Sequence, residues 1–166
     1  MEIRRFSKTD SVDDVSRVYA ESWKSAYKSI IPQDYLDKLD DCRWSGFIAN
    51  ELSNLWVASD GERIVGTSTY APARDKKYSG WGEIISIYLL PQHSRHGIGT
   101  KLLKASMDSL FLMKFNKIYL WVLEDNYPAR DFYEKNGFYH NDHSGDTREI
   151  TIGGKRLNEI RYIYKK

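Results

Sequence analysis

Two glycines, Gly97 and Gly99, mark the segment of this chain whose residue types could do chemistry. They lie in the stretch 84–104, IISIYLLPQHSRHGIGTKLLK, which alternates apolar residues as a strand does, turns at Pro91 and continues as an amphipathic helix from Ile98. Small residues at the start of a helix leave its backbone N–H groups accessible, and the helix dipole adds positive potential there. Because this arrangement suits a phosphate group, we expect a ligand that carries phosphate.

Known glycine-loop patterns narrow the kind of phosphate ligand. The dinucleotide fingerprint would place a third small residue where the chain has Leu102, and no βαβ unit with a strand-end acid about 20 residues downstream follows. The P-loop pattern places a lysine directly after its second glycine, whereas Thr100 separates Gly99 from Lys101. The spacing excludes both patterns, and a tight turn without a ligand is the alternative that a lone G-x-G leaves open.

A second block, 118–138 (IYLWVLEDNYPARDFYEKNGF), has the features of a strand followed by a short helix. Asn126 can cap this helix, Pro128 suits its first turn, and Gly137 can end it in a left-handed conformation. The helix expected over 98–114 lies between the strand of the first block and the strand of the second. Strand, helix, strand and helix therefore follow one another through both blocks.

Together the two blocks resemble motifs A and B of the GCN5-related N-acetyltransferase (GNAT) family. The family pattern Gln/Arg-x-x-Gly-x-Gly/Ala appears as Ser94-Arg95-His96-Gly97-Ile98-Gly99, with Ser94 where the family has Gln or Arg. Motif B is similar in Asn126, Ala129, Phe132-Tyr133 and Gly137-Phe138. Ile30-Ile31-Pro32 and the segment 157–162 (LNEIRY) resemble a common bacterial subgroup, so the resemblance covers nearly the whole chain.

The resemblance implies an α/β (α+β) fold. Its central sheet would be mixed and mostly antiparallel, with about seven strands flanked by helices. The sheet would splay between its fourth and fifth strands to admit acetyl-CoA as a cosubstrate, with no metal. The implied reaction is transfer of an acetyl group to a primary amine by direct attack in a ternary complex. A regulatory module that binds CoA or acyl-CoA without catalysis is one alternative, and a nucleotide-binding protein is another.

Length and composition limit the number of domains and the kinds of partner that this chain can have. We expect the 166 residues to form one domain with its own core. The net charge is +2, from 25 Lys and Arg against 23 Asp and Glu, without a long basic block, which argues against nucleic-acid binding. The single cysteine, Cys42, fits a reducing cytoplasm, and neither a signal peptide nor a membrane span is expected. The partner would be a small-molecule or peptide amine, and formation of a homodimer is left open.

Periodicity and turn residues predict the elements that must position these motifs. Turns at Asp60-Gly61 and Gly153-Gly154 predict two hairpins, and 72–79 reads as a polar loop. Strands are expected at 2–6, 55–59, 63–71, 83–89, 118–123, 147–152 and 156–164. Helices are expected at 12–26, 32–39, 42–49, 98–114 and between Asn126 and Gly137.

The resemblance also implies roles for single residues. The backbone N–H of Leu89 would polarise the thioester carbonyl, and loss of one such donor costs about 2.7–4 kcal/mol of barrier. Tyr133 would act as the general acid toward the leaving thiolate, because a phenol with a pKa near 10 is protonated at neutral pH; core packing is its alternative role. Glu83 would act as the base, directly or through water, or is a solvated acid. The implied cofactor-binding residues are Ile87, Tyr88, Leu89, Ser94, Arg95, His96, Gly97, Ile98, Gly99, Thr100, Asn126, Ala129 and Tyr133.

Other reactive side chains favour structural roles. Cys42 has no adjacent histidine, so a small buried side chain is the better interpretation than a nucleophile. His140 and His143 lie three residues apart, but the turn HNDHSGD lacks a full metal-ligand set and reads as a solvated loop. His93 and His96 flank the glycine loop and either contact phosphate or are simply exposed. Aromatic residues that pack by default and could alternatively contact the acceptor are Trp23, Tyr27 and Tyr35.

Overall fold

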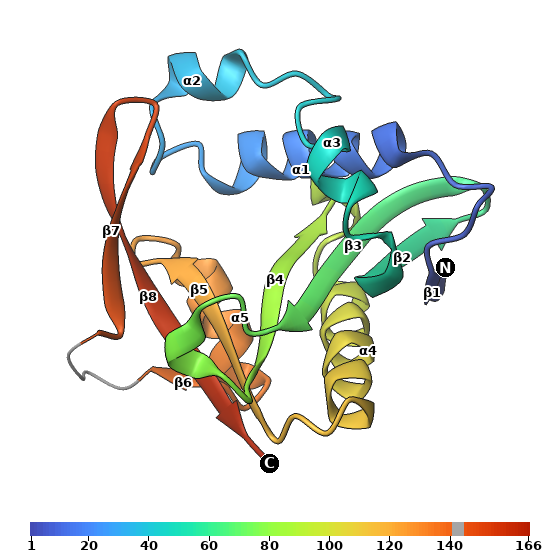
Figure 1. The fold of residues 1–166 in the computed structure, drawn as a ribbon. Helices are drawn as coiled ribbons and strands as arrows, with labels where there is room; N and C mark the ends of the chain where they lie inside the picture. Colours follow the sequence, from blue (N-terminus) through green and yellow to red (C-terminus); the bar gives the residue numbers. More distant parts are fainter. Residues whose placement is uncertain (141–144) are drawn as a thin grey trace.

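The computed structural model describes residues 1–140 and 145–166 of the chain. Within these ranges, eight strands form one sheet with helices on both faces (Figure 1). The strands are β1 (Glu2–Arg5), β2 (Leu55–Asp60), β3 (Arg63–Pro72), β4 (Gly82–Leu89), β5 (Lys117–Leu123), β6 (Tyr139–His140), β7 (Thr147–Ile152) and β8 (Lys155–Lys165). The helices are α1 (Val12–Ala26), α2 (Gln33–Asp37), α3 (Ser45–Ala49), α4 (Ile98–Leu112) and α5 (Tyr127–Lys135), with single 3-10 turns at Leu52–Asn54, Lys76–Tyr78 and Pro91–His93.

The sheet has the order β1-β2-β3-β4-β5-β8-β6, with β7 also paired to β8. Every pair in it is antiparallel except β4 with β5, which is parallel. The expected mixed, mostly antiparallel sheet is therefore confirmed. The additional strand is β6, which is too short to leave a periodic signal and pairs with β8 through Tyr139 and His140.

The sheet forks between β4 and β5, as expected. These strands pair only at Gly82 with Ile118 and at Glu83 with Tyr119, and then separate. A β-bulge lies directly after this point, because Thr69 and Tyr70 of β3 face Ser86 and Ile84 and leave Ile85 without a partner. A bulge bends its strand and increases the local twist, so it turns the rest of β4 away from β5.

Helices cover the two faces of the sheet as separate layers. The Tyr19 hydroxyl of α1 hydrogen-bonds Ser86 and Thr69, whereas Ser106 of α4 hydrogen-bonds Ser68. Since successive side chains of a strand point to opposite faces, α1 and α4 lie on opposite sides of β3. Helix α5 joins α4 on its side by packing Phe132, Tyr133 and Ala129 onto the cluster that includes β5 and β8 residues.

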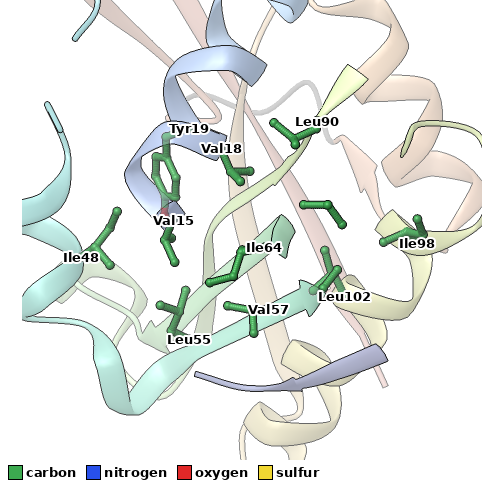
Figure 2. Close-up of a cluster of buried hydrophobic side chains, with 12 residues drawn as sticks. Val15, Val18, Tyr19, Ile48, Leu55, Val57, Ile64, Leu90, Ile98 and Leu102 are labelled. Carbon is green, nitrogen blue, oxygen red and sulfur yellow. The ribbon is translucent and has the colours of Figure 1, made fainter. Parts of the chain in front are cut away.

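Apolar burial holds these layers together. Figure 2 shows the cluster beneath α1, where Val15, Val18 and Tyr19 meet Leu55 and Val57 of β2. On the far side of the fork, α2 and the β7–β8 hairpin share a separate cluster that includes Leu36, Leu157 and Ile152, and these elements lie side by side in Figure 1. At the hairpin tip, Lys155 Nζ donates to the Ile30 carbonyl at 2.7 Å. The end of α1, α2 and the hairpin thus pack together on this side of the fork.

Most expected boundaries agree with the structure within a few residues. The segment 42–49 is the main exception, because the helix there starts only at Ser45. The Cys42 N–H donates to the Asp40 carboxylate at 2.7 Å, a local turn that competes with helix formation. The expected polar loop after β3 contains the 3-10 turn Lys76–Tyr78, in which Tyr78 is buried. Throughout the described ranges, the helices are too short or too polar to span a bilayer.

Candidate active site

A cavity of about 580 Å³ opens where β4 separates from β5. Its walls come from the end of α1, the exposed edge of β4, the loop before α4, the end of β5, helix α5 and the β7–β8 hairpin. The lining residues are Trp23, Ala26, Tyr27, Ile85, Ser86, Ile87, Tyr88, Leu89, Ser94, Arg95, Gly97, Gly99, Thr100, Trp121, Val122, Leu123, Asn126, Pro128, Ala129, Phe132, Tyr133, Ile152 and Glu159. Both glycine-containing blocks therefore meet at one site.

The N-terminus of α4 forms one end of the cavity. Gly97 precedes the helix with φ of 75°, a left-handed conformation that side-chain-bearing residues rarely adopt, and no side chain caps the helix. The first helical hydrogen bond runs from Lys101 N–H to the Gly97 carbonyl, so the N–H groups of Ile98, Gly99 and Thr100 have no intrahelical acceptor. A Cβ built on Gly97 would meet nothing within 4 Å. The helix end is thus an open cradle for an anion.

Arg95 adds a positive charge to this cradle. Its backbone also has a positive φ of 63°, so two residues of the loop turn into the left-handed region before the helix begins. Such turns aim successive N–H groups at one point and form a concave anion site. The Arg95 and Ser94 side chains both line the cavity. A guanidinium is therefore present one position after the serine that departs from the motif.

The middle of the cavity is the unpaired edge of β4. Leu90 N–H donates to the Val65 carbonyl at 2.8 Å, which makes Leu90 and Val65 a hydrogen-bonded pair of the β3–β4 ladder. Because such pairs alternate along an antiparallel ladder, the N–H groups of Leu89 and Ile87 point away from β3. β5 does not take them, since its pairing with β4 ends before this point. Two backbone donors therefore face the fork.

Tyr133 of α5 lies across the fork from this edge. Asn126 caps the helix, as predicted, because its side chain accepts the Ala129 N–H at 3.3 Å. Burial raises the pKa of the Tyr133 phenol above its usual value, and the neighbouring Tyr27 adds to the shift. Its hydroxyl has no hydrogen-bond partner among the described residues, and its ring packs on Phe138 and Tyr162. Tyr133 thus holds a proton that it can donate.

Two further tyrosines lie beside it. Burial raises the pKa of Tyr27 to about 12, although its contact with Tyr88 acts in the opposite direction. Burial also raises the pKa of Tyr88. Both residues line the cavity, and Tyr88 packs on Tyr19 with ring centroids 4.4 Å apart. These tyrosines are therefore uncharged at neutral pH and make this part of the site aromatic and rich in hydroxyl groups.

Glu83 does not line the cavity, contrary to the role expected for it. It is 4% exposed, and its carboxylate accepts hydrogen bonds from the Arg74 guanidinium at 2.6 and 3.1 Å and from the Tyr119 hydroxyl at 2.9 Å. Burial alone would raise the pKa of Glu83, but the hydrogen bonds and the charge of Arg74 lower it overall. A carboxylate that already accepts these hydrogen bonds is a poor proton acceptor. Glu83 instead links β4 to Arg74 and to Tyr119 of β5 at the point where the two strands still pair.

Comparison with known proteins identifies the architecture. The sequence profile of the Acetyltransferase (GNAT) family matches residues 15–138. An uncharacterized N-acetyltransferase of Bacillus subtilis, YuaI, is 30% identical over 161 residues, which cover 94% of this chain and 88% of that protein. The chain belongs to the GNAT family.

Other relatives agree with this GNAT assignment. An uncharacterized N-acetyltransferase of Archaeoglobus fulgidus is 32% identical over 139 residues, 80% of this chain and 89% of that protein. Among solved structures, PaiA N-acetyltransferase from Thermoplasma acidophilum in complex with coenzyme A superposes with a TM-score of 0.78 at 22% identity, covering 99% and 98% of the two chains. The GNAT chain described here is accordingly an acetyl-CoA-dependent acetyltransferase.

The GNAT cavity fits a coenzyme A thioester on its own geometry. The uncapped α4 terminus with Arg95 offers donors and charge to a pyrophosphate, and the open β4 edge offers N–H groups to an extended polar chain. Among the described residues, no group of three or more His, Cys, Asp or Glu side chains is placed to hold a metal.

With two exceptions, the residues predicted to bind the cofactor are found in the lining of the cavity. The Ile98 side chain is buried in the core under α4, and His96 is exposed outside the lining. Cys42 was expected to be buried but is exposed, because it lies in the turn before α3. Trp23 and Tyr27 line the cavity, whereas Tyr35 does not. His143 lies outside the described residues.

No sequence pattern pointed to three residues that line the far end of the cavity. Trp121, Ile152 and Glu159 belong to β5, β7 and β8, and the register places Glu159 beside Leu123. Their convergence depends on the position of the last hairpin relative to the fork, which no local pattern specifies.

Proposed function

We propose that the chain transfers the acetyl group of acetyl-CoA to the nitrogen of an amine by direct attack, with both substrates bound together. The observation that carries this proposal is the continuous cavity in the β4–β5 fork, which has an anion cradle at one end and aromatic and acidic walls at the other. The cosubstrate supplies an activated acetyl thioester. The chain has to bind it, polarise its carbonyl, admit the amine and protonate the sulfur.

The residues of the fork support a role in each of these steps. The N–H groups at the start of α4 and the Arg95 side chain bind the pyrophosphate. The Leu89 N–H donates to the carbonyl oxygen, and Ser22 Oγ fixes the same peptide segment by donating to the Leu89 carbonyl at 2.9 Å. As the N–C bond forms and the C–S bond breaks, the Tyr133 hydroxyl, kept protonated by burial, gives its proton to the departing sulfur. The attacking nitrogen loses one proton to solvent, and Tyr133 takes one up from solvent before the next turnover.

Direct attack is favoured because the described part of the cavity offers no activated nucleophile for an acetyl-enzyme. Neither cysteine nor histidine is present in its lining. Ser86 lines it, but its hydroxyl lies 2.7 Å from that of Tyr19, with no base beside it. Cys42 is exposed and far along the chain from every lining element.

Steady-state kinetics with thiol detection test the proposal. Varying acetyl-CoA at several amine concentrations should give intersecting double-reciprocal lines, and intact mass should stay unchanged when the enzyme meets acetyl-CoA alone. Parallel lines together with a stable gain of one acetyl group would overturn direct attack. A rise in melting temperature with acetyl-CoA, but no thiol released with any of a broad panel of amines, would indicate a binding module instead of an acetyl-transferring enzyme.

A further inference from the structure

The cavity has one charged side chain near each end. Among the described lining residues, Arg95 beside α4 and Glu159 on β8 are the two that carry a full charge. Arg95 belongs to the anion cradle, so the cofactor accounts for it. Glu159 lies at the other end, among Trp23, Tyr27 and Ile152, where the proposed cofactor role accounts for no acid.

Among the described residues, one oxygen of the Glu159 carboxylate has a side-chain partner and the other has none. Arg148 on the neighbouring strand β7 donates through Nε to Oε2 at 2.7 Å, and its Nη2 lies 2.7 Å from the same oxygen as an ion pair. Oε1 receives no hydrogen bond from the described residues. The Glu159 side chain is only 17% exposed, but Oε1 is not among the fully buried atoms without a partner, so a bound group can reach it.

The surrounding rings are suited to a positive charge. The Arg148 guanidinium already lies 4.3 Å from the centroid of Trp121, which shows that this ring accepts a cation on its face. Trp23 and Tyr27 are edge to face with centroids 5.0 Å apart and line the same end. A partly buried carboxylate among aromatic faces is the usual chemistry for holding an ammonium group.

This charge cannot be that of the reacting nitrogen, which has to be neutral when it attacks. Glu159 already holds one cation, the Arg148 guanidinium, through Oε2. We propose that the acceptor is an aliphatic amine with a second positive charge, and that Glu159 binds this second charge through Oε1. The inference rests on the proposed acetyl transfer and names the class of acceptor for that same site.

Matched acceptors test the proposed class. Linear α,ω-diamines of three to eight carbons are compared with the monoamine and the ω-amino acid of the same length, by thiol release at saturating acetyl-CoA. At the length that spans the site, kcat/KM for the diamine should exceed that for the monoamine roughly 10- to 100-fold, as expected for a charge-assisted contact. The amino acid should be the poorest of the three.

Two variants on the hairpin locate the effect. Glu159→Gln should remove the preference for diamines mainly by raising KM for the diamine, while affinity for acetyl-CoA stays near that of the wild type. Glu149→Gln is the matched control, because this exposed acid on the adjacent strand lies outside the cavity lining and should keep the preference.

The variant Arg148→Met distinguishes acceptor binding by Glu159 from a purely structural role of Glu159. If Glu159 only anchors Arg148, then Arg148→Met should impair the enzyme as Glu159→Gln does. If Oε1 and Oε2 can both serve the acceptor once Arg148 is gone, Arg148→Met should lower KM for the diamine. The methionine keeps apolar contact with Trp121, and this arm remains informative even when the glutamine variant folds poorly.

The inference is overturned if diamine and monoamine react equally at every length, or if Glu159→Gln leaves the preference intact. It is also overturned if Arg148→Met and Glu159→Gln raise KM alike. Absence of thiol release with every amine is a different result, since it removes the proposed acetyl transfer and the inference with it.

Discussion

Replacement of Gly99 by aspartate should separate cofactor binding from stability. The backbone of Gly99 is helical, and a Cβ added there would lie 3.5 and 3.6 Å from Phe132, which is ordinary van der Waals contact. Since Phe132 lines the cavity, the new carboxylate would enter the cradle at the start of α4. The substitution should therefore leave the folded protein stable but weaken the binding of acetyl-CoA.

The two expected magnitudes have opposite signs. An acid in the first turn complements the helix dipole, and loss of a glycine lowers the entropy of the unfolded chain, which together stabilise by about 1 kcal/mol. A like charge about 4 Å from the pyrophosphate costs about 4 kcal/mol at an effective dielectric constant of 20. After screening by salt we expect an affinity loss of at least roughly a hundredfold, with an unchanged or slightly raised melting temperature.

Calorimetry with acetyl-CoA and thermal unfolding provide the assay. Gly99→Asn has almost the same shape without the charge, so it should lose much less affinity, and the gap between the two variants should narrow at high salt. Gly46→Asp makes the same change at the start of α3, where a Cβ meets nothing within 4 Å, and should leave binding unchanged. A folded Gly99→Asp protein with wild-type affinity would refute the placement of the pyrophosphate at α4.

Two further substitutions test the fork. Tyr133→Phe should lower kcat about a hundredfold with little change in acetyl-CoA affinity or melting temperature, because the hydroxyl has no partner among residues 1–140 and 145–166 and the ring packing is kept. A kcat within twofold of wild type, with chemistry rate-limiting, would make Tyr133 a packing residue. Glu83→Gln should lower the free energy of unfolding by about 1–3 kcal/mol through loss of the Arg74 pair while kcat stays within about threefold. Because folding lowers the pKa of Glu83, the stability difference from wild type is full above the unfolded value of about 4.3 and should shrink as pH falls through the folded pKa; a large kcat loss would restore Glu83 as the base.

Local signals in the sequence predicted the parts of the fold that depend on local physics. Asn126 caps α5, Gly97 takes the left-handed turn before α4, and the Asp60-Gly61 turn joins β2 to β3. Each of these depends on a few neighbouring residues whose side chains or backbone freedom decide the conformation. The end of the cavity at α4 was predictable for the same reason, because it consists of backbone at a helix start.

The end of the cavity around Glu159 and the surroundings of Glu83 were not predictable, because both depend on long-range register. In the sequence, Glu83 looks like any acid at the end of a strand. Only the structure shows that its carboxylate is bonded to Arg74 and Tyr119. Glu159 reads as one acid in an alternating strand, and it enters the cavity because β8 pairs with β5 so that Glu159 faces Leu123. Neither distinction exists in the residues alone.

The fork gives this sheet an edge in its interior. An unpaired strand edge on a protein surface invites another chain to add a strand, and sheet proteins usually block such edges with charges, prolines or bulges. The Leu89 side of β4 instead faces a cavity lined by Trp23, Tyr27, Phe132 and Tyr133, whose side chains a second polypeptide strand would have to displace. A slender extended ligand has room in this cavity, and the molecule thereby keeps a strand edge available for binding without exposing it to self-association.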